Sequence, residues 1–470
     1  MNKKLFPILS AFLLLFSLIE KGQATETYRP ETSVAGFIQL PGSGRQVYNF
    51  NPGWRFFKGD IHGAESVDFD DRSWTIVSTP HTVELMPAEA SGCRNYQGPA
   101  WYRKHFVLPA ETKGKRVLIH FEAAMGKQVL YLNGKRIQEH VGGYLPFTLD
   151  LTTNGIQAGD SCLLAIFVDN SNDKSFPPGK PQYTLDFAYH GGIYRDVWMI
   201  AKSPVSITDP LDSQTVAGGG VFVHFDKISE KSAQVYVNTE LQNDNQHTET
   251  VTVETTLTDA DGKVIKRTSG KLSLKSGEKK IIRQQIEVKS PKLWSPDAPY
   301  LYKVQSRIKK GNQSIDGGIT RIGIRLAEFR GKDGFWLNGK PFVQLVGANR
   351  HQDFAYVGNA LPNSQQWRDA KRLRDAGCTI IRVAHYPQDP SFMDACDELG
   401  MFVIVATPGW QYWNKDVKFG ELVHQNTREM IRRDRNHPSV LMWEPILNET
   451  RYPLDFALKA LEITKEEFPY

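Results

Sequence analysis

The stretch that decides the fold is residues 432–449, RRDRNHPSVLMWEPILNE. Residues 440–443 form an apolar run with the character of a buried strand, and a short turn after it ends in Asn448 and Glu449. In barrels of alternating strands and helices, polar side chains at the carboxyl ends of the strands form the functional face. The carboxyl group of Glu449 is therefore the first candidate functional group.

Four apolar runs alternate with four amphipathic segments after position 329. The runs lie at residues 341–349, 379–386, 402–408 and 439–446, and the helix-like segments at residues 364–376, 390–399, 420–435 and 454–468. This order predicts a parallel sheet with helices outside it. Because a complete (β/α)8 TIM barrel takes roughly 250 residues, we expect residues 329–470 to form its N-terminal half, a partial barrel of four βα units.

Upstream of the barrel, the pattern is that of strands alone. Residues 46–205 contain apolar runs of strand length, with turn signals at Asn133-Gly134 and Gly142-Gly143. They predict a jelly-roll β-sandwich over residues 25–205. Residues 206–328 hold about seven more polar strand patterns and a hairpin signal, DADGK, which is typical of an immunoglobulin-like β-sandwich. The expected fold class is a multidomain protein with β and α/β parts.

The first 24 residues have the composition of a secretory signal peptide. Lys3 and Lys4 precede an apolar run at residues 5–19, and small residues lie before a cleavage point after Ala24. The run is short for a membrane span, and no cysteine that could carry a lipid follows it closely. The alternative is an uncleaved anchoring helix. We expect a periplasmic or extracellular protein with no membrane insertion after signal removal.

The charge balance argues against a nucleic-acid partner. The formal net charge is +5, and residues 1–24 hold three lysines and one glutamate, so the remainder carries +3, close to neutral for this length. The four cysteines, Cys93, Cys162, Cys378 and Cys396, lack metal-ligand spacing. Cys378 and Cys396 fall in helical patterns, where buried free thiols are expected. Disulfides remain the alternative, with three possible pairings.

Polar and aromatic side chains collect where the four barrel strands end, and parallel strands bring such residues to one mouth. They are Asn349, Arg350 and His351 on the first strand, Arg382, His385 and Tyr386 on the second, Trp410, Tyr412 and Trp413 after the third, and Glu444, Asn448 and Glu449 on the fourth. Aromatic rings suit the apolar faces of sugars, and the polar groups suit hydroxyls. No glycine-rich nucleotide loop is present. The set favours a carbohydrate ligand over a phosphate.

Each of these residues also has a purely structural interpretation. His351 could brace a turn, Arg382 could neutralise neighbouring carboxylates, and the two tryptophans could pack beneath a loop. Glu444 precedes a proline and could be a buried structural acid, and Glu449 alone would be surface charge. Their coincidence at the strand ends favours a functional site.

Eight strings resemble glycoside hydrolase family 2, the family of β-galactosidases, β-glucuronidases and β-mannosidases. Five lie in the first sandwich and three in the barrel, so the resemblance spans nearly the whole mature chain. The strings are DRSWTIVSTPHTV (71–83), GPAWYRKHF (98–106), LNGKRI (132–137), GGYLPFTLDLT (142–152), GGIYRDVWM (191–199), VGANRHQD (346–353), IRVAHYP (381–387) and RRDRNHPSV (432–440).

The resemblance implies a retaining exo-β-glycosidase, most similar to β-galactosidases, that hydrolyses terminal non-reducing β-linked sugars of glycans or oligosaccharides. It makes Glu449 the general acid and base, and Asn448 the ligand of the sugar 2-hydroxyl. Arg382 and His385 match residues that shape the subsite. The remaining matches are His351, which lines the site, and Asp169 of the first sandwich, which would reach the terminal sugar.

The resemblance also implies a second carboxylate. A retaining glycosidase needs a nucleophile about 5–5.5 Å from the acid. The family places this nucleophile on a later strand, so we expect it to be absent from this chain.

The sequence departs from the family pattern after the third strand and at the fourth. WEPILNE, residues 443–449, has one residue more than the usual string, with Leu447 in place of a glycine. VATPGWQYWN, residues 405–414, replaces an acidic string, so that Trp410 and Trp413 suggest an aromatic wall. Because the acidic and histidine ligands of the Mg²⁺-dependent members are missing, we expect no site metal and no cofactor.

Two classes of function are consistent with the sequence. One is a secreted exo-β-glycosidase whose barrel is incomplete in this chain and which has little turnover alone. The other is a non-catalytic carbohydrate-binding protein. The Asn448-Glu449 pair favours the enzyme, and the incomplete barrel favours the binding protein. Both have a carbohydrate partner, neither needs nucleic acid, and both are compatible with a homo-oligomer.

Overall fold

The computed structural model describes residues 39–86, 95–185, 187–342 and 344–470, and all of them belong to one compact unit, residues 34–470. The expected signal peptide at residues 1–24 and Cys93 lie outside the described residues. Among the residues described, we find no helix with the length and hydropathy that a membrane crossing requires.

The first sandwich packs two antiparallel sheets, with strand orders β1-β10-β5-β8 and β3-β2-β4-β9-β6-β7, around a core that includes Trp54, Phe121 and Ile166. The predicted turn at Asn133 and Gly134 joins β6 to β7, with φ values of 49° and 81°. The strands are β1 (Gln46–Asn49), β2 (Trp54–Lys58), β3 (Thr75–Val77), β4 (Pro99–Val107), β5 (Arg116–Phe121), β6 (Gly126–Leu132), β7 (Lys135–Gly142), β8 (Phe147–Asp150), β9 (Ser161–Asp169) and β10 (Val197–Lys202).

The second sandwich follows from simple alternation. On β13, Ala233, Val235 and Val237 are buried, while the residues between them are partly exposed. One sheet has the order β11-β13-β12 with β16 also paired to β13, and the other has the order β15-β14-β17-β18. The strands are β11 (Val205–Ile207), β12 (Val221–Asp226), β13 (Ser232–Asn243), β14 (Glu249–Thr258), β15 (Val264–Leu274), β16 (Lys279–Lys289), β17 (Tyr302–Lys310) and β18 (Gln313–Ile322).

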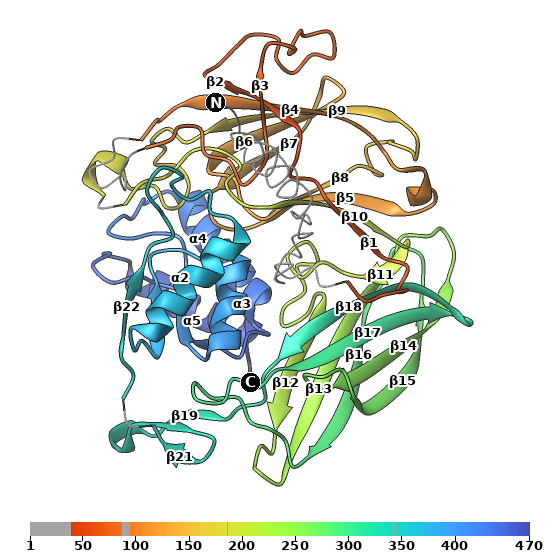
Figure 1. The fold of residues 1–470 in the computed structure, drawn as a ribbon, viewed down its shortest axis with the longest axis vertical. Coiled ribbons are helices and arrows are strands. Elements are labelled where there is room, and N and C mark those ends of the chain that lie inside the picture. The colour runs from red at the N-terminus through yellow and green to blue at the C-terminus, as the bar shows by residue number, and fades with distance from the viewer. Residues whose placement is uncertain (1–38, 87–94, 186, 343) are drawn as a thin grey trace, which may run out of the picture. The chain divides into compact units, whose positions relative to one another are not determined.

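The third part is the expected partial barrel, with a parallel sheet of order β22-β23-β24-β25 and helices beside it (Figure 1). The strands are β22 (Gly347–Arg350), β23 (Ile380–Val383), β24 (Phe402–Ala406) and β25 (Val440–Glu444), and the helices are α2 (Asn363–Asp375), α3 (Pro390–Leu399), α4 (Val417–Asp434) and α5 (Leu454–Glu467). Together with the two sandwiches, this arrangement confirms the predicted fold class.

The predicted first barrel strand, residues 341–349, is wrong in extent. The start of the predicted range belongs to a small separate sheet, made of β19 (Ala327–Phe329), β20 (Phe335–Leu337) and β21 (Lys340–Pro341). The barrel strand β22 starts only at Gly347. At Gly347 the backbone approaches β23 so closely that a Cβ atom would lie 1.7 Å from the carbonyl oxygen of Ile380. Only glycine permits this approach.

Two interfaces join the barrel to the sandwiches. Arg195 of the first sandwich is fully buried and donates to the side-chain oxygen of Gln352 at 2.9 Å and to the carbonyl of Pro387 at 2.8 Å. On the second sandwich, the side-chain amide of Asn436 donates to the carbonyl of Val221 at 2.8 Å. Part of the basic string at residues 432–440 therefore has a structural role, which the sequence did not reveal.

Three cysteines fall within the described residues, and all are free thiols. Cys162 and Cys396 are buried, whereas Cys378 is only partly buried and lies just beyond the end of α2. The expected burial thus holds for Cys396 and is incomplete for Cys378.

Candidate active site

Arg382 on β23 lies at the centre of the strand-end cluster. Its guanidinium donates to both oxygens of Glu444, with Nε–Oε2 and Nη2–Oε1 distances of 2.8 and 2.7 Å. Such two-pronged pairs are strong and fix geometry. Nη2 also donates to Asn448 Oδ1 at 3.0 Å, and Nη1 lies 3.3 Å from His385 Nδ1. Arg382 thus neutralises Glu444, as its structural interpretation holds, and also gathers two predicted site residues.

The contacts of Arg382 determine which atoms its neighbours present. Arginine carries only hydrogen-bond donors, so Asn448 turns its carbonyl oxygen to Arg382 and leaves its amide N–H groups free to face outward. By the same reasoning, His385 accepts through Nδ1 and carries its proton on Nε2. Burial, followed by the charges of Arg382, His351 and Lys180, lowers the pKa of His385 to about 3. The imidazole is therefore a neutral N–H donor at physiological pH.

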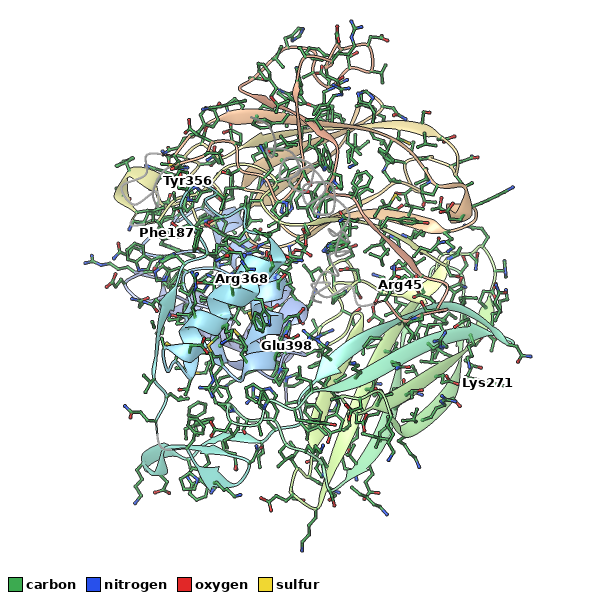
Figure 2. All side chains as sticks on the ribbon, viewed as in Figure 1. Arg45, Phe187, Lys271, Tyr356, Arg368 and Glu398 are labelled. Atoms are coloured by element: carbon green, nitrogen blue, oxygen red, sulfur yellow. The ribbon has the colours of Figure 1, made fainter. Side chains whose placement is uncertain are left out.

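Aromatic rings line this cluster. Trp410 lies parallel to the His385 ring with centroids 5.0 Å apart, and Phe187, labelled in Figure 2, stacks on His351 at 4.7 Å. The Lys180 ammonium lies 3.9 Å from the centroid of the Trp410 ring. Flat rings beside N–H donors suit a ligand with one apolar face and several hydroxyls.

Glu449 lies at the exposed end of the turn after β25. Its carboxylate accepts a hydrogen bond from the side-chain amide of Gln411. The backbone here has three residues with positive φ, namely Glu449 at 58°, Gln411 at 52° and Trp410 at 127°. Each such conformation costs an L-residue roughly 1 kcal/mol or more, and such strain collects at functional sites.

Two predicted site residues, Trp413 and Asp169, make contacts away from the cluster around Arg382. Trp413 packs 4.4 Å from the Phe456 ring and 5.9 Å from Phe419, between α4 and α5. This packing matches the structural alternative for Trp413, so the aromatic wall consists of Trp410 and Phe187. Asp169, at the end of β9, accepts a hydrogen bond from the backbone of Ser171 at 2.8 Å. Its contact with a sugar stays a prediction.

Three residues of the cluster escaped the sequence analysis, namely Lys180, Phe187 and Gln411. Gln411 could have been found, because it lies between two residues already noted after the third strand. Lys180 and Phe187 come from a loop of the first sandwich, and no periodicity or motif links residues so far apart in sequence. A parallel sheet predicts its own strand ends, not the loops of another domain that cover them.

The described residues contain one group with ligand atoms close enough to hold a metal ion, Asp394, Asp397 and His437, all within 4.8 Å of one another. It lies on α3 and after α4, not at the strand ends. Burial opposes charge on His437, but Asp397 outweighs it and raises the pKa of the imidazole to about 9. Arg321 forms an ion pair with Asp394. His437 and Arg321 thus already supply cationic partners to these carboxylates.

Three models of one family match this chain. The sugar-binding domain of glycosyl hydrolases family 2 matches residues 64–204, the family's next domain residues 219–325, and its TIM-barrel domain residues 329–466. The order and positions agree with the two sandwiches and the partial barrel. The chain belongs to glycosyl hydrolase family 2.

Individual relatives are longer than this chain. A β-galactosidase of Thermoanaerobacter pseudethanolicus is 36% identical to this chain, and the match covers 89% of this chain and 54% of the relative. A β-glucuronidase of Formosa agariphila is 32% identical, and the match covers 86% of this chain and 42% of the relative. The crystal structure of a Bacteroides uniformis β-glucuronidase superposes with a TM-score of 0.81 at 30% identity, covering 90% of this chain and 51% of that one. The chain thus spans about half the length of these relatives.

Proposed function

We propose that this chain provides part of the active site of a retaining exo-β-glycosidase, acting on terminal β-galactosides or the related β-glucuronides. One observation carries the proposal: Arg382 fixes Asn448 next to Glu449, at strand ends lined by Trp410 and His385. The names of the relatives, β-galactosidase and β-glucuronidase, support the substrate class. The composition of residues 1–24 supports action outside the cytoplasm.

In this proposal each group has a defined task. The outward amide of Asn448 donates to the sugar 2-hydroxyl, and this contact strengthens as charge develops on the ring. The Nε2–H of His385 donates to another hydroxyl, and Trp410 packs on an apolar face of the sugar. Glu449 protonates the leaving oxygen and later deprotonates the attacking water.

The attacking carboxylate is the remaining part of the mechanism. Glu444 is a poor candidate, because Arg382 holds both of its oxygens. We therefore expect the nucleophile to be a different carboxylate, on a later barrel strand as the family resemblance implies. A chain without that carboxylate should bind sugars with negligible turnover, since covalent catalysis without its nucleophile loses several orders of magnitude in rate.

Substitution of Glu449 tests the proposal in a polypeptide that carries a closed eight-stranded barrel. Glu449→Gln should lower kcat/KM about 100-fold or more for alkyl β-glycosides, which need a proton donor, and far less for 2,4-dinitrophenyl glycosides. Glu421→Gln, an exposed change on α4, is the matched control. Equal losses with both leaving groups would remove the acid role of Glu449. Sugar binding without any turnover would identify a carbohydrate-binding protein instead.

A further inference from the structure

The first sandwich reaches the candidate acid through a chain of hydrogen bonds. Lys180 donates through Nζ to Gln411 Oε1 at 2.6 Å, and Gln411 Nε2 donates to the Glu449 carboxylate. Lys180 belongs to the loop between β9 and β10, whereas Gln411 and Glu449 follow β24 and β25. The contact therefore joins parts of the chain that lie 231 residues apart.

The chemistry of these groups determines which atom donates and which accepts in each of the two hydrogen bonds. An ammonium group only donates hydrogen bonds, and the carbonyl oxygen of a glutamine only accepts them. Lys180 therefore determines that Oε1 of Gln411 faces the sandwich and that Nε2 faces Glu449. Without the ammonium, the amide could rotate by half a turn and present its oxygen to the carboxylate, which would repel it.

Other contacts hold Lys180 and Gln411, the two donors of this hydrogen-bond chain, in place. Lys180 is 8% exposed, its backbone carbonyl accepts from the Tyr189 hydroxyl at 3.0 Å, and its ammonium lies over the Trp410 ring. The backbone N–H of Gln411 donates to Thr450 Oγ1 at 2.9 Å, next to Glu449 in sequence. Both Gln411 and Glu449 have positive φ. A strained turn needs such external contacts to keep one conformation.

We propose that Lys180 is a positioning residue of the first sandwich, which holds Glu449 in its working orientation through Gln411. The inference rests on the proposed role of Glu449 as proton donor. It also gives the first sandwich a part in proton transfer, beyond contact with the sugar. A misplacement of about 1 Å of a reacting group costs roughly 100-fold in rate.

Nuclear magnetic resonance tests the hydrogen-bond chain without any turnover, in the 470-residue protein labelled with ¹⁵N-glutamine. The side-chain amide of Gln411, assigned with Gln411→Met, should shift with pH, and Glu449→Gln should abolish that shift. Lys180→Met should reduce it at least twofold, whereas Lys180→Arg, which also only donates, should preserve it. Lys174→Met removes the same charge from the same loop and should change nothing.

Kinetics in the polypeptide with a closed barrel test the consequence. Lys180→Met should lower kcat/KM for alkyl glycosides by roughly 10- to 100-fold and spare dinitrophenyl glycosides, a pattern that lost stability alone would not produce. Gln411→Met, at an exposed position, should reproduce this pattern and replaces Lys180→Met if that variant fails to fold.

The two proposals fail in different ways. An unchanged Gln411 titration in Lys180→Met, or equal losses with both leaving groups, would overturn the positioning role alone. A pH-dependent Gln411 shift that disappears in Lys180→Met would support the hydrogen-bond chain. If Glu449→Gln nevertheless lowers activity equally for both leaving groups, the role of Glu449 as proton donor is rejected while the hydrogen-bond chain stands.

Discussion

His385 illustrates how the neighbours of one residue set its chemistry. A histidine in water titrates near pH 6.5 and would change its charge across the physiological range. Here burial, together with the nearby cations Arg382 and Lys180, holds the ring neutral, and Arg382 at 3.3 Å from Nδ1 fixes the tautomer. A neutral ring stacked on Trp410 can donate one directed hydrogen bond to a sugar without introducing a charge.

We therefore expect His385 to stay neutral from pH 5 to 8, because its pKa is lowered to about 3. Titration of ¹⁵N-labelled histidine side chains, with His385→Asn to assign the signal, measures this directly. A protonation step of His385 between pH 5 and 7 would contradict the prediction. In Arg382→Met the pKa should move upward, because one of the depressing charges is gone.

At the scale of elements, the decisive contact is between two loops. The loop between β9 and β10 packs on the loop after β24, where Asn414 Nδ2 donates to the carbonyl of Lys174 at 2.7 Å. Gly179 lies directly against the second loop, since a Cβ atom there would lie 2.5 Å from the Tyr412 ring, and its φ is 73°. Small size and a left-handed backbone are both required at this position.

Gly179→Ala should accordingly destabilise the protein by about 2–4 kcal/mol, from the sum of backbone strain and overpacking. Gly155→Ala is the matched control, because Gly155 has a similar φ of 81° but nothing within 4 Å of the added atom. It should cost only about 1 kcal/mol. Urea unfolding of the two variants separates the cost of backbone strain from the cost of overpacking. Equal losses in the free energy of unfolding would mean that the Tyr412 ring moves aside freely.

The elements themselves were largely predictable, and the contacts between them were not. Helix α3 begins and ends where predicted, because Asp389 caps its first turn by accepting from Ser391 N at 2.8 Å and Gly400 ends it with a φ of 71°. Helix α4 starts earlier than predicted, since Asp416 caps it in the same way.

In the candidate site, too, residues at the strand ends could be predicted, whereas residues placed by contacts between domains could not. Arg382, His385 and Asn448 were predictable, because parallel strands bring their ends together. Trp413 was ambiguous, because an aromatic residue in a loop serves a core as readily as a ligand. Lys180 could not be found from the sequence, because its position depends on how one domain packs on another.

At the scale of the whole molecule, Asp397 of α3 connects the barrel to the second sandwich. Its side chain contacts His437 Nδ1 at 2.6 Å and accepts from Ser439 N at 3.0 Å. Its backbone carbonyl accepts from the indole of Trp294 at 2.9 Å. A buried carboxylate of this kind is stable only while its cationic partner keeps the charge.

The charge on His437 makes the stability that its ion pair with Asp397 contributes depend on pH. Its folded-state pKa of about 9 lies above the ordinary value of 6.5, so the stabilisation is complete below about pH 6.5 and is lost as the pH rises through 9. The difference corresponds to roughly 3 kcal/mol.

Denaturant unfolding between pH 6 and 10 should show this loss in the wild type but not in His437→Gln, which should be less stable at pH 6. His247→Gln removes a contact between an exposed imidazole and Glu249 and should have little effect at any pH. Parallel pH profiles for the wild type and His437→Gln would refute the assignment.

The fully buried Arg195 has a consequence for protein engineering. Its guanidinium belongs to one module by sequence and donates to the Tyr144 carbonyl of that module, but two further acceptors, Gln352 and the Pro387 carbonyl, belong to another. A chimera that takes its first sandwich from one homologue and its barrel from a second therefore inherits the guanidinium and these two acceptors from different parents. Such hybrids will assemble only when both parents agree at this point, so recombination breakpoints should be chosen by matched interface residues instead of by linker position.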